Sequence, residues 1–145
     1  MLAALSAEGA EYLLIGAHAL AAHRQARATK DMDLLIDATP ANARRVLAAL
    51  RRFGAHLADL TETDLTTPEI VFQVGVEPNR IDFLTSIPAV DFRQAWERRI
   101  EVHMGEMTVP VIGREDLIRN KLATGRPQDL ADVARLEGRE NERLR

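Results

Sequence analysis

The chain has 145 residues, of which 46% are hydrophobic and 28% are charged, a composition typical of a folded globular protein. Nineteen Lys and Arg against 22 Asp and Glu give a formal net charge of −3, which argues against a protein that coats DNA. The absence of cysteine excludes disulfide scaffolds, thiolate zinc sites and cysteine nucleophiles.

We expect one domain over residues 1–145, with residues 137–145 as a frayed helix or a truncated extension. The N-terminal segment carries acidic residues and no basic region, so no secretory signal is predicted. Apolar stretches such as Tyr12–Ala17 are too short to span a bilayer. Together with the lack of cysteine, these features predict a cytoplasmic protein that does not enter a membrane.

The spacing of apolar residues predicts alternating helices and strands in the first part of the chain. Thr39 and Pro40 form a typical helix start, and Gly54 is a typical helix stop. Polar residues 55–68 follow no clear period. The elements expected before them are a helix over 1–9, a strand over 12–15, a helix over 17–27, a strand over 31–37 and a helix over 40–53.

The second part of the chain predicts two hairpins and three helices. Strands 70–76 and 80–85 flank a turn at Pro78, and strands 100–104 and 107–112 flank a turn at Gly105. Helices are expected over 91–98, over 115–124 and from 127 onward. Because hairpins and crossover connections are mixed, the predicted fold class is α+β, a mixed β-sheet with helices packed on it.

Gly16, Ala17 and His18 lie between the first predicted strand and the helix that follows it. Glycine lets the backbone approach a ligand closely, and the N–H groups at a helix start can bind an anion such as phosphate. A strand-to-helix turn with glycine is also common without any ligand. This feature alone therefore leaves both interpretations open.

Asp31 and Asp33 are two residues apart on a predicted strand, so their side chains lie on the same side. Adjacent carboxylates repel each other unless a cation lies between them, and oxygen ligands of this kind suit Mg²⁺. Asp82 lies between Ile81 and Phe83 on a later strand, where a carboxylate must point away from the core or be compensated. If the two strands are neighbours, the three carboxylates converge as in two-metal phosphoryl-transfer sites; otherwise they are solvated acids on exposed strand faces.

Basic and hydroxyl residues precede the acidic pair. Arg27 and Lys30 could contact phosphate oxygens, neutralise the acids or be solvated, and Thr29 could orient the turn. His18 and His23 are five residues apart, a spacing that does not place both on one helix face for a metal. The chain contains no Walker-type motif and no dinucleotide-binding fingerprint.

Taken together, the strand, the Gly16-Ala17 turn, Asp31-x-Asp33 and the later strand with Asp82 resemble the nucleotidyltransferase superfamily of the DNA polymerase β type. The closer resemblance is to small bacterial minimal nucleotidyltransferases and AbiEii-like toxins. It is carried by LLIGAHALAAHRQARATKDMDLLID, RIDFLTSI and VPVIGREDLIRNKLATGRPQDLADVARL. The family has Gly-Gly or Gly-Ser where this chain has Gly16-Ala17, so a backbone donor is kept while a serine contact to phosphate is lost.

The resemblance implies two Mg²⁺ ions held by Asp31 and Asp33, with Asp82 completing the site of the ion that lowers the pKa of the acceptor hydroxyl. It also implies an NTP held near Gly16, Ala17, His18, Arg27, Thr29 and Lys121. The implied reaction transfers an NMP from the NTP to a hydroxyl of RNA (a tRNA end), a protein or a small molecule, with release of pyrophosphate. A role in a toxin–antitoxin or defence system follows from the resemblance alone.

By position alone, Lys121 is a surface lysine on a helix, and Asp129 could hold Arg126 or Lys121 in place. In similar proteins, a lysine here and the Arg/Asp motif after it lie near the nucleotide. The alternative function is a non-catalytic module that binds a nucleotide or a partner, as half of a toxin–antitoxin pair or as a homodimer.

Overall fold

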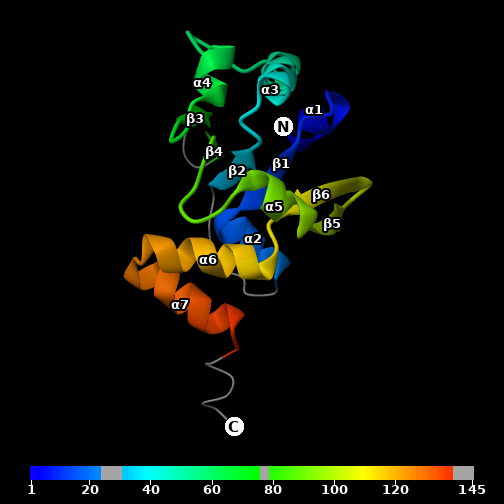
Figure 1. Cartoon of the computed structure of the whole chain (residues 1–145). Helices are drawn as coiled ribbons and strands as arrows, with labels where there is room; N and C mark the ends of the chain where they lie inside the picture. The colour runs from blue at the N-terminus through cyan, green and yellow to red at the C-terminus, as the bar shows by residue number, and fades with distance from the viewer. Residues whose placement is uncertain (24–30, 76–78, 139–145) are drawn as a thin grey trace.

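A computed structural model of the chain describes residues 1–23, 31–75 and 79–138, and within them six strands form one mixed sheet (Figure 1). The strands are β1 (Tyr12–Ile15), β2 (Met32–Ile36), β3 (Val71–Val74), β4 (Ile81–Leu84), β5 (Ile100–Met104) and β6 (Met107–Val111). Their order across the sheet is β3-β4-β2-β1-β6-β5. The predicted α+β class is therefore confirmed.

Seven helices in the described part of the chain accompany the sheet. They are α1 (Leu2–Ala7), α2 (Gly16–Ala22), α3 (Pro40–Phe53), α4 (Glu62–Thr66), α5 (Phe92–Glu97), α6 (Arg114–Thr124) and α7 (Pro127–Leu136). Helices α1, α3 and α4 gather at one end of the molecule, while α6 and α7 pack against each other at the opposite end, beyond α2 (Figure 1). The sheet thus connects two groups of helices.

Strand β2 has a neighbour on each side, and the two pairings bring distant residues together. It runs antiparallel to β1, with Ile15 opposite Asp33, and parallel to β4, with Asp33 opposite Asp82. The two hairpins predicted from the sequence, β3–β4 and β5–β6, are confirmed as antiparallel pairs. Three separate segments therefore meet at the end of the sheet where β1 finishes and β2 begins.

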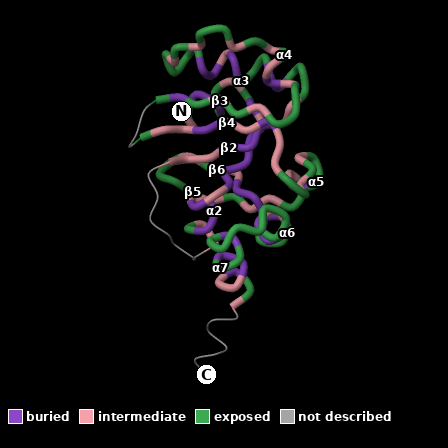
Figure 2. Tube along the Cα trace, turned by 90° about the vertical axis from the view of Figure 1, so that its left-hand side faces the viewer, coloured by how far each residue is buried: buried purple, intermediate pink, exposed green. Residues whose placement is uncertain are grey.

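The core lies along the middle of this sheet. All four residues of β1 are buried, as expected for a central strand covered on both faces. In β2 only the second half, Leu34–Ile36, is buried, while Met32 and Asp33 are half-buried. Figure 2 shows buried backbone running through the centre of the molecule. Each fully buried aliphatic side chain contributes roughly 1.5–3 kcal/mol, so the apolar half of β2 anchors the acidic half.

Helix α3 forms where its start and stop signals predict. The Thr39 hydroxyl accepts a hydrogen bond from the Asn42 N–H at 3.3 Å, Pro40 opens the helix, and Gly54 ends it in a left-handed conformation with φ of 85°. Helix α2 ends earlier than predicted, at Ala22. His23 leaves the helix, and its Nε2 lies 2.8 Å from the carbonyl oxygen of Ile112.

Helix α4 lies within the segment that had no predicted element. The Thr61 hydroxyl accepts from the Asp64 N–H at 3.2 Å, and the Asp64 carboxylate accepts from the Thr61 N–H at 3.0 Å. These bonds form a capping box in which aspartate replaces the usual Glu or Gln. The Thr-x-x-Asp spacing is therefore the signal that could have located this helix.

Asn42 joins α3 to the ends of β1 and β2 and is only 3% exposed. Its Oδ1 accepts from the Glu11 N–H at 2.7 Å, and its Nδ2 donates to the carbonyls of Glu11 and Asp37, both at 2.9 Å. One buried amide thus bonds to three backbone groups at the ends of these strands, of which the Glu11 carbonyl also accepts from the Asp37 N–H at 3.4 Å.

Replacement of Asn42 by Ala is expected to lower the free energy of unfolding by about 3 kcal/mol, because each buried backbone group left without a partner costs roughly 1–3 kcal/mol. Urea unfolding followed by circular dichroism measures this. The matched control is Asn120→Ala, since the half-exposed Asn120 makes one hydrogen bond, to the carbonyl of Pro88. Equal losses in the two variants would contradict the bridging role of Asn42.

Candidate active site

Three aspartates converge at the end of the sheet, as the sequence predicts if β2 and β4 are neighbours. Asp31 directly precedes β2 and Asp33 lies within it, while Asp82 on β4 is the register partner of Asp33. Asp82 is 9% exposed, so the alternative of a solvated strand face is wrong for this residue. Asp31 and Asp33 are half-buried.

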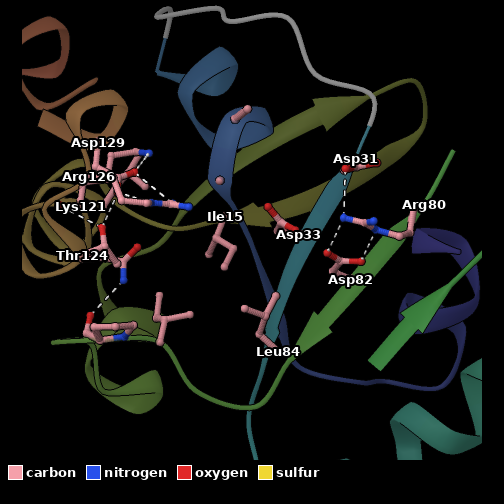
Figure 3. A pocket seen from close by; sticks show the side chains of 16 residues that line it. Ile15, Asp31, Asp33, Arg80, Asp82, Leu84, Lys121, Thr124, Arg126 and Asp129 are labelled. Carbon is pink, nitrogen blue, oxygen red and sulfur yellow. Dashed lines mark hydrogen bonds and ion pairs between the residues drawn. The ribbon is translucent and has the colours of Figure 1, made fainter. Parts of the chain in front are cut away.

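Arg80 lies among these acids and was not singled out from the sequence. Its Nε donates to Asp82 Oδ1 at 2.9 Å, and its Nη2 donates to Asp82 Oδ2 at 3.3 Å and to Asp31 Oδ2 at 3.2 Å (Figure 3). The signal is the Arg-Ile-Asp spacing, because residues two apart on a strand share a face. Arg80 thereby links the acids of two strands.

Asp33 differs from its two neighbours, since it makes no hydrogen bond or ion pair with any described residue. Burial raises the pKa of the Asp33 carboxyl, and the negative charges of Asp82 and Asp31 raise it further, while the charges of Arg80 and His18 oppose the shift. The charged form of Asp33 is therefore under electrostatic stress that a bound cation would relieve.

Gly16 provides the space that Asp33 occupies. Its φ of 68° is a conformation that favours glycine, and a Cβ atom at this position would lie 2.6 Å from Asp33 Oδ2. Gly16 and Ala17 line the same pocket as the acids, and Ala17 is 8% exposed. His18 follows in α2 and is not among the lining residues, although its charge acts on Asp33.

The opposite wall of the pocket is a buried ionic network between α6 and α7. Lys121 is 5% exposed, and its Nζ lies 2.9 Å from Asp132 Oδ2 and 3.6 Å from Asp129 Oδ1. The interpretation of Lys121 as a surface lysine is therefore wrong. Its burial was not predictable from α6 alone, because both counter-ions belong to the next helix.

Asp129 also organises the loop between the two helices. It accepts from the Thr124 hydroxyl at 2.7 Å and from Arg126 Nε at 2.7 Å, and it also pairs with Lys121, so it contacts both of the residues that the sequence offered as its alternative partners. Burial by itself would raise the pKa of Asp129, but the hydrogen bonds from Arg126 and Thr124 outweigh it and lower the pKa to about 2. Asp129 is therefore ionised at neutral pH.

Between the two walls lies a pocket of about 390 Å³ (Figure 3). Its apolar lining comes from the strands, the loop after β4 and α6, and consists of Ile15, Leu84, Ile87, Pro88 and Leu117. The guanidinium of Arg126 points into the pocket, and its side chain is 75% exposed. The hydrogen bond with Asp129 is the main cause of the raised pKa of Arg126, and the charge of Asp33 adds to it. The pocket is thus acidic at the sheet, apolar in the middle and basic at Arg126.

Two residues expected near the nucleotide, Arg27 and Thr29, lie outside the described residues, as does Lys30. Of the other expected positions, Gly16, Ala17 and Lys121 line the pocket. The residues expected from the sequence thus lie on both walls of the pocket, while Arg80 and Asp132 were not among them.

The donor set at the acidic end suits a hard divalent cation, because three carboxylates supply only oxygen ligands. As the side chains stand, no three His, Cys, Asp or Glu residues in the described ranges are arranged to hold a metal ion. Arg80 forms ion pairs with Asp31 and Asp82 instead, so these acids already surround one cationic group. The ligand chemistry of these residues would suit Mg²⁺, while their present arrangement surrounds Arg80.

Comparison with known protein families agrees with this fold. The chain belongs to the family described as "Nucleotidyltransferase of unknown function (DUF6036)", whose model matches residues 2–137. The expectation of a nucleotidyltransferase is confirmed at this level; the description names no substrate and no toxin system. No curated protein matches the sequence. In the part of the chain that is described, no helix has the length and apolar character needed to cross a membrane.

Asp33→Asn is expected to stabilise the cation-free protein at pH 7, by on the order of 1 kcal/mol, because it removes a poorly compensated, half-buried charge. The raised pKa of Asp33 means that folding favours its protonated form, so wild-type stability is lost as the pH rises through the folded pKa. The gain should be larger at pH 7 than at pH 4. Thermal unfolding in EDTA measures it.

The control for this variant is Asp37→Asn, after the other end of β2, where the carboxylate pairs with Arg93 at 3.1 Å. This control should not stabilise the protein. A neutral or destabilising effect of Asp33→Asn at pH 7 would contradict the charge repulsion described for the site.

Asp129→Asn is expected to lower the free energy of unfolding by about 3 kcal/mol at pH 7, because it leaves part of a buried ionic network uncompensated. Since the lowered pKa of Asp129 is about 2, its stabilising effect is lost only as the pH falls toward that value. The loss measured by urea unfolding should therefore be the same at pH 4.5 as at pH 7. A loss that disappears by pH 4.5 would show that Asp129 is not held ionised by its partners.

Proposed function

We propose that this protein is a Mg²⁺-dependent enzyme that transfers an NMP from an NTP to an acceptor hydroxyl and releases pyrophosphate. The observation that carries the proposal is the convergence of Asp31, Asp33 and Asp82 in a pocket whose far wall presents Arg126. Membership of a nucleotidyltransferase family supports the reaction class.

Charge explains why a divalent cation is needed. An NTP is strongly anionic, and the sheet side of the pocket is acidic, so the two repel each other without a cation between them. Asp31, Asp33 and Asp82 would hold the metal through carboxylate oxygens. When bound, Mg²⁺ neutralises triphosphate charge and lowers the pKa of the acceptor hydroxyl.

The residues of the chain then act mainly by positioning. Gly16, which carries no Cβ, leaves room for the Asp33 carboxylate at the pocket. Arg126 Nη1 makes no hydrogen bond to a described residue and is available for phosphate oxygens. The apolar lining offers a surface for the nucleoside.

The acceptor oxygen bonds to the α-phosphorus while the bond from that phosphorus to the oxygen bridging it to the β-phosphorus breaks. Pyrophosphate leaves with the electron pair, and the hydroxyl proton passes to water. Positioning and charge neutralisation suffice, with no covalent intermediate.

The resemblance to polymerase β-type enzymes, and to minimal nucleotidyltransferases and AbiEii-like toxins, supports a tRNA end or a protein side chain as the acceptor. It also supports a role in a toxin–antitoxin or defence system, with an antitoxin or a second copy of the chain as partner. The same proposal includes a role in holding the NTP for Arg27, Thr29 and Lys121.

The test is label transfer from each of the four NTPs labelled at the α-phosphate, in the presence of Mg²⁺ and a cell extract. A labelled RNA or protein band is expected with the wild-type protein. Asp31→Asn/Asp33→Asn should reduce labelling more than about 100-fold, the scale of losing one essential electrostatic group. Asp37→Asn, on the same chain segment but outside the pocket, should label normally.

Binding without transfer would favour the non-catalytic module. It is recognised as a Mg²⁺-dependent rise in melting temperature with an NTP but no labelled product. If the protein gave no labelled product and showed no Mg²⁺-dependent binding of any of the four NTPs, both functions would be contradicted.

A further inference from the structure

We propose that Arg80 is an internal counter-cation that competes with the divalent metal for Asp31 and Asp82, so that metal loading requires the guanidinium to leave the acids. The inference rests on the proposed function, because it takes the three aspartates as metal ligands. It adds a reason why the cation-free site is stable and predicts a measurable reduction of metal affinity.

The contacts of Arg80 show what the metal must displace. Both oxygens of Asp82 accept from Arg80, at 2.9 Å and 3.3 Å, and Asp31 Oδ2 accepts at 3.2 Å. The side chains of Arg80, Asp31 and Asp82 are 28%, 30% and 12% exposed, respectively. Ion pairs that are partly shielded from water in this way are stronger than fully exposed ones, which contribute little.

The two cations compete for electrostatic and geometric reasons. A Mg²⁺ ion binds carboxylate oxygens at about 2.0–2.1 Å and demands near-octahedral geometry, so it has to approach the Asp82 oxygens, both of which accept from Arg80. A guanidinium that remained in contact with these oxygens would place its positive charge within a few ångströms of the ion. Arg80 in its present contacts therefore opposes a metal shared by Asp31 and Asp82.

Asp33 makes the exchange feasible. It is the member of the cluster that has no hydrogen bond to Arg80 or to any other described residue, although it lies opposite Asp82 in the sheet. A divalent ion can therefore first bind Asp33 and then draw Asp82 and Asp31 away from Arg80. The displaced guanidinium stays at the pocket, where the phosphates of an arriving nucleotide would offer it a new partner.

The test measures metal binding in the nucleotide-free protein, with Mn²⁺ as the probe and the electron paramagnetic resonance signal of free Mn²⁺ as the readout. Arg80→Ala is expected to bind Mn²⁺ at least about tenfold more tightly than the wild type, because a competing positive charge has been removed from within a few ångströms of the ion. Arg80→Gln, which keeps a polar side chain of similar reach without the charge, should show the same change and serves if the alanine variant folds poorly.

Arg93→Ala is the matched control. Arg93 also bridges two acids, Glu11 and Asp37, but at the other end of β2 and outside the pocket. Its loss should leave Mn²⁺ affinity unchanged. Asp33→Asn should abolish binding in both the wild-type and the Arg80→Gln backgrounds.

A second readout separates competition from simple structural support. In EDTA the Arg80 variants should melt at a lower temperature than the wild type, and saturating Mn²⁺ should raise their melting temperature by more than it raises that of the wild type. Unchanged or weaker Mn²⁺ binding in folded Arg80 variants, with binding still dependent on Asp33, would overturn the inference and leave the proposed function standing. No Asp33-dependent Mn²⁺ binding in any variant would overturn both.

Discussion

The parallel pairing of β2 with β4 is the constraint on which the site depends. It sets Asp33 opposite Asp82, although 48 residues lie between them in the sequence, and together with the parallel pairing of β1 and β6 it joins strands that are not neighbours in the chain. The apolar halves of these strands are buried and fix the register, because a slip by one residue would turn every side chain to the other face. The packing of Leu34 and Phe83 thus positions the acids, although neither of these buried residues lines the pocket.

Two ionic arrangements of different character face each other across the pocket. At the sheet, a partly exposed guanidinium is shared by two acids and a third acid is uncompensated. Between α6 and α7, Lys121, Asp129 and Asp132 are almost fully buried, and each has charged partners. Breaking a buried pair is far more costly than exchanging an exposed one. The helix side is therefore a fixed wall, while the sheet side is the part that can change its cation.

Much of the fold could be predicted from local signals. The cap at Thr39, the turn at Gly105 and the apolar run of β1 each determine an element within a few residues. The three aspartates were also visible, because their spacing and apolar neighbours are local properties. Lys121 was misjudged because both of its counter-ions, Asp129 and Asp132, lie on α7, and its burial depends on helix–helix packing that no local pattern encodes. Arg80 was missed although its spacing to Asp82 is a local signal, and its contact with Asp31 depends on strand order.

The contact between Gly16 and Asp33 has a consequence for transplanting or redesigning the site. An oxygen of Asp33 already fills the volume that any side chain at position 16 would require. The direction of that carboxylate is therefore set by the backbone turn between β1 and α2 as well as by its own rotamer. A designer who grafted the three acids onto another sheet without this turn would reproduce the composition of the cluster but not its shape.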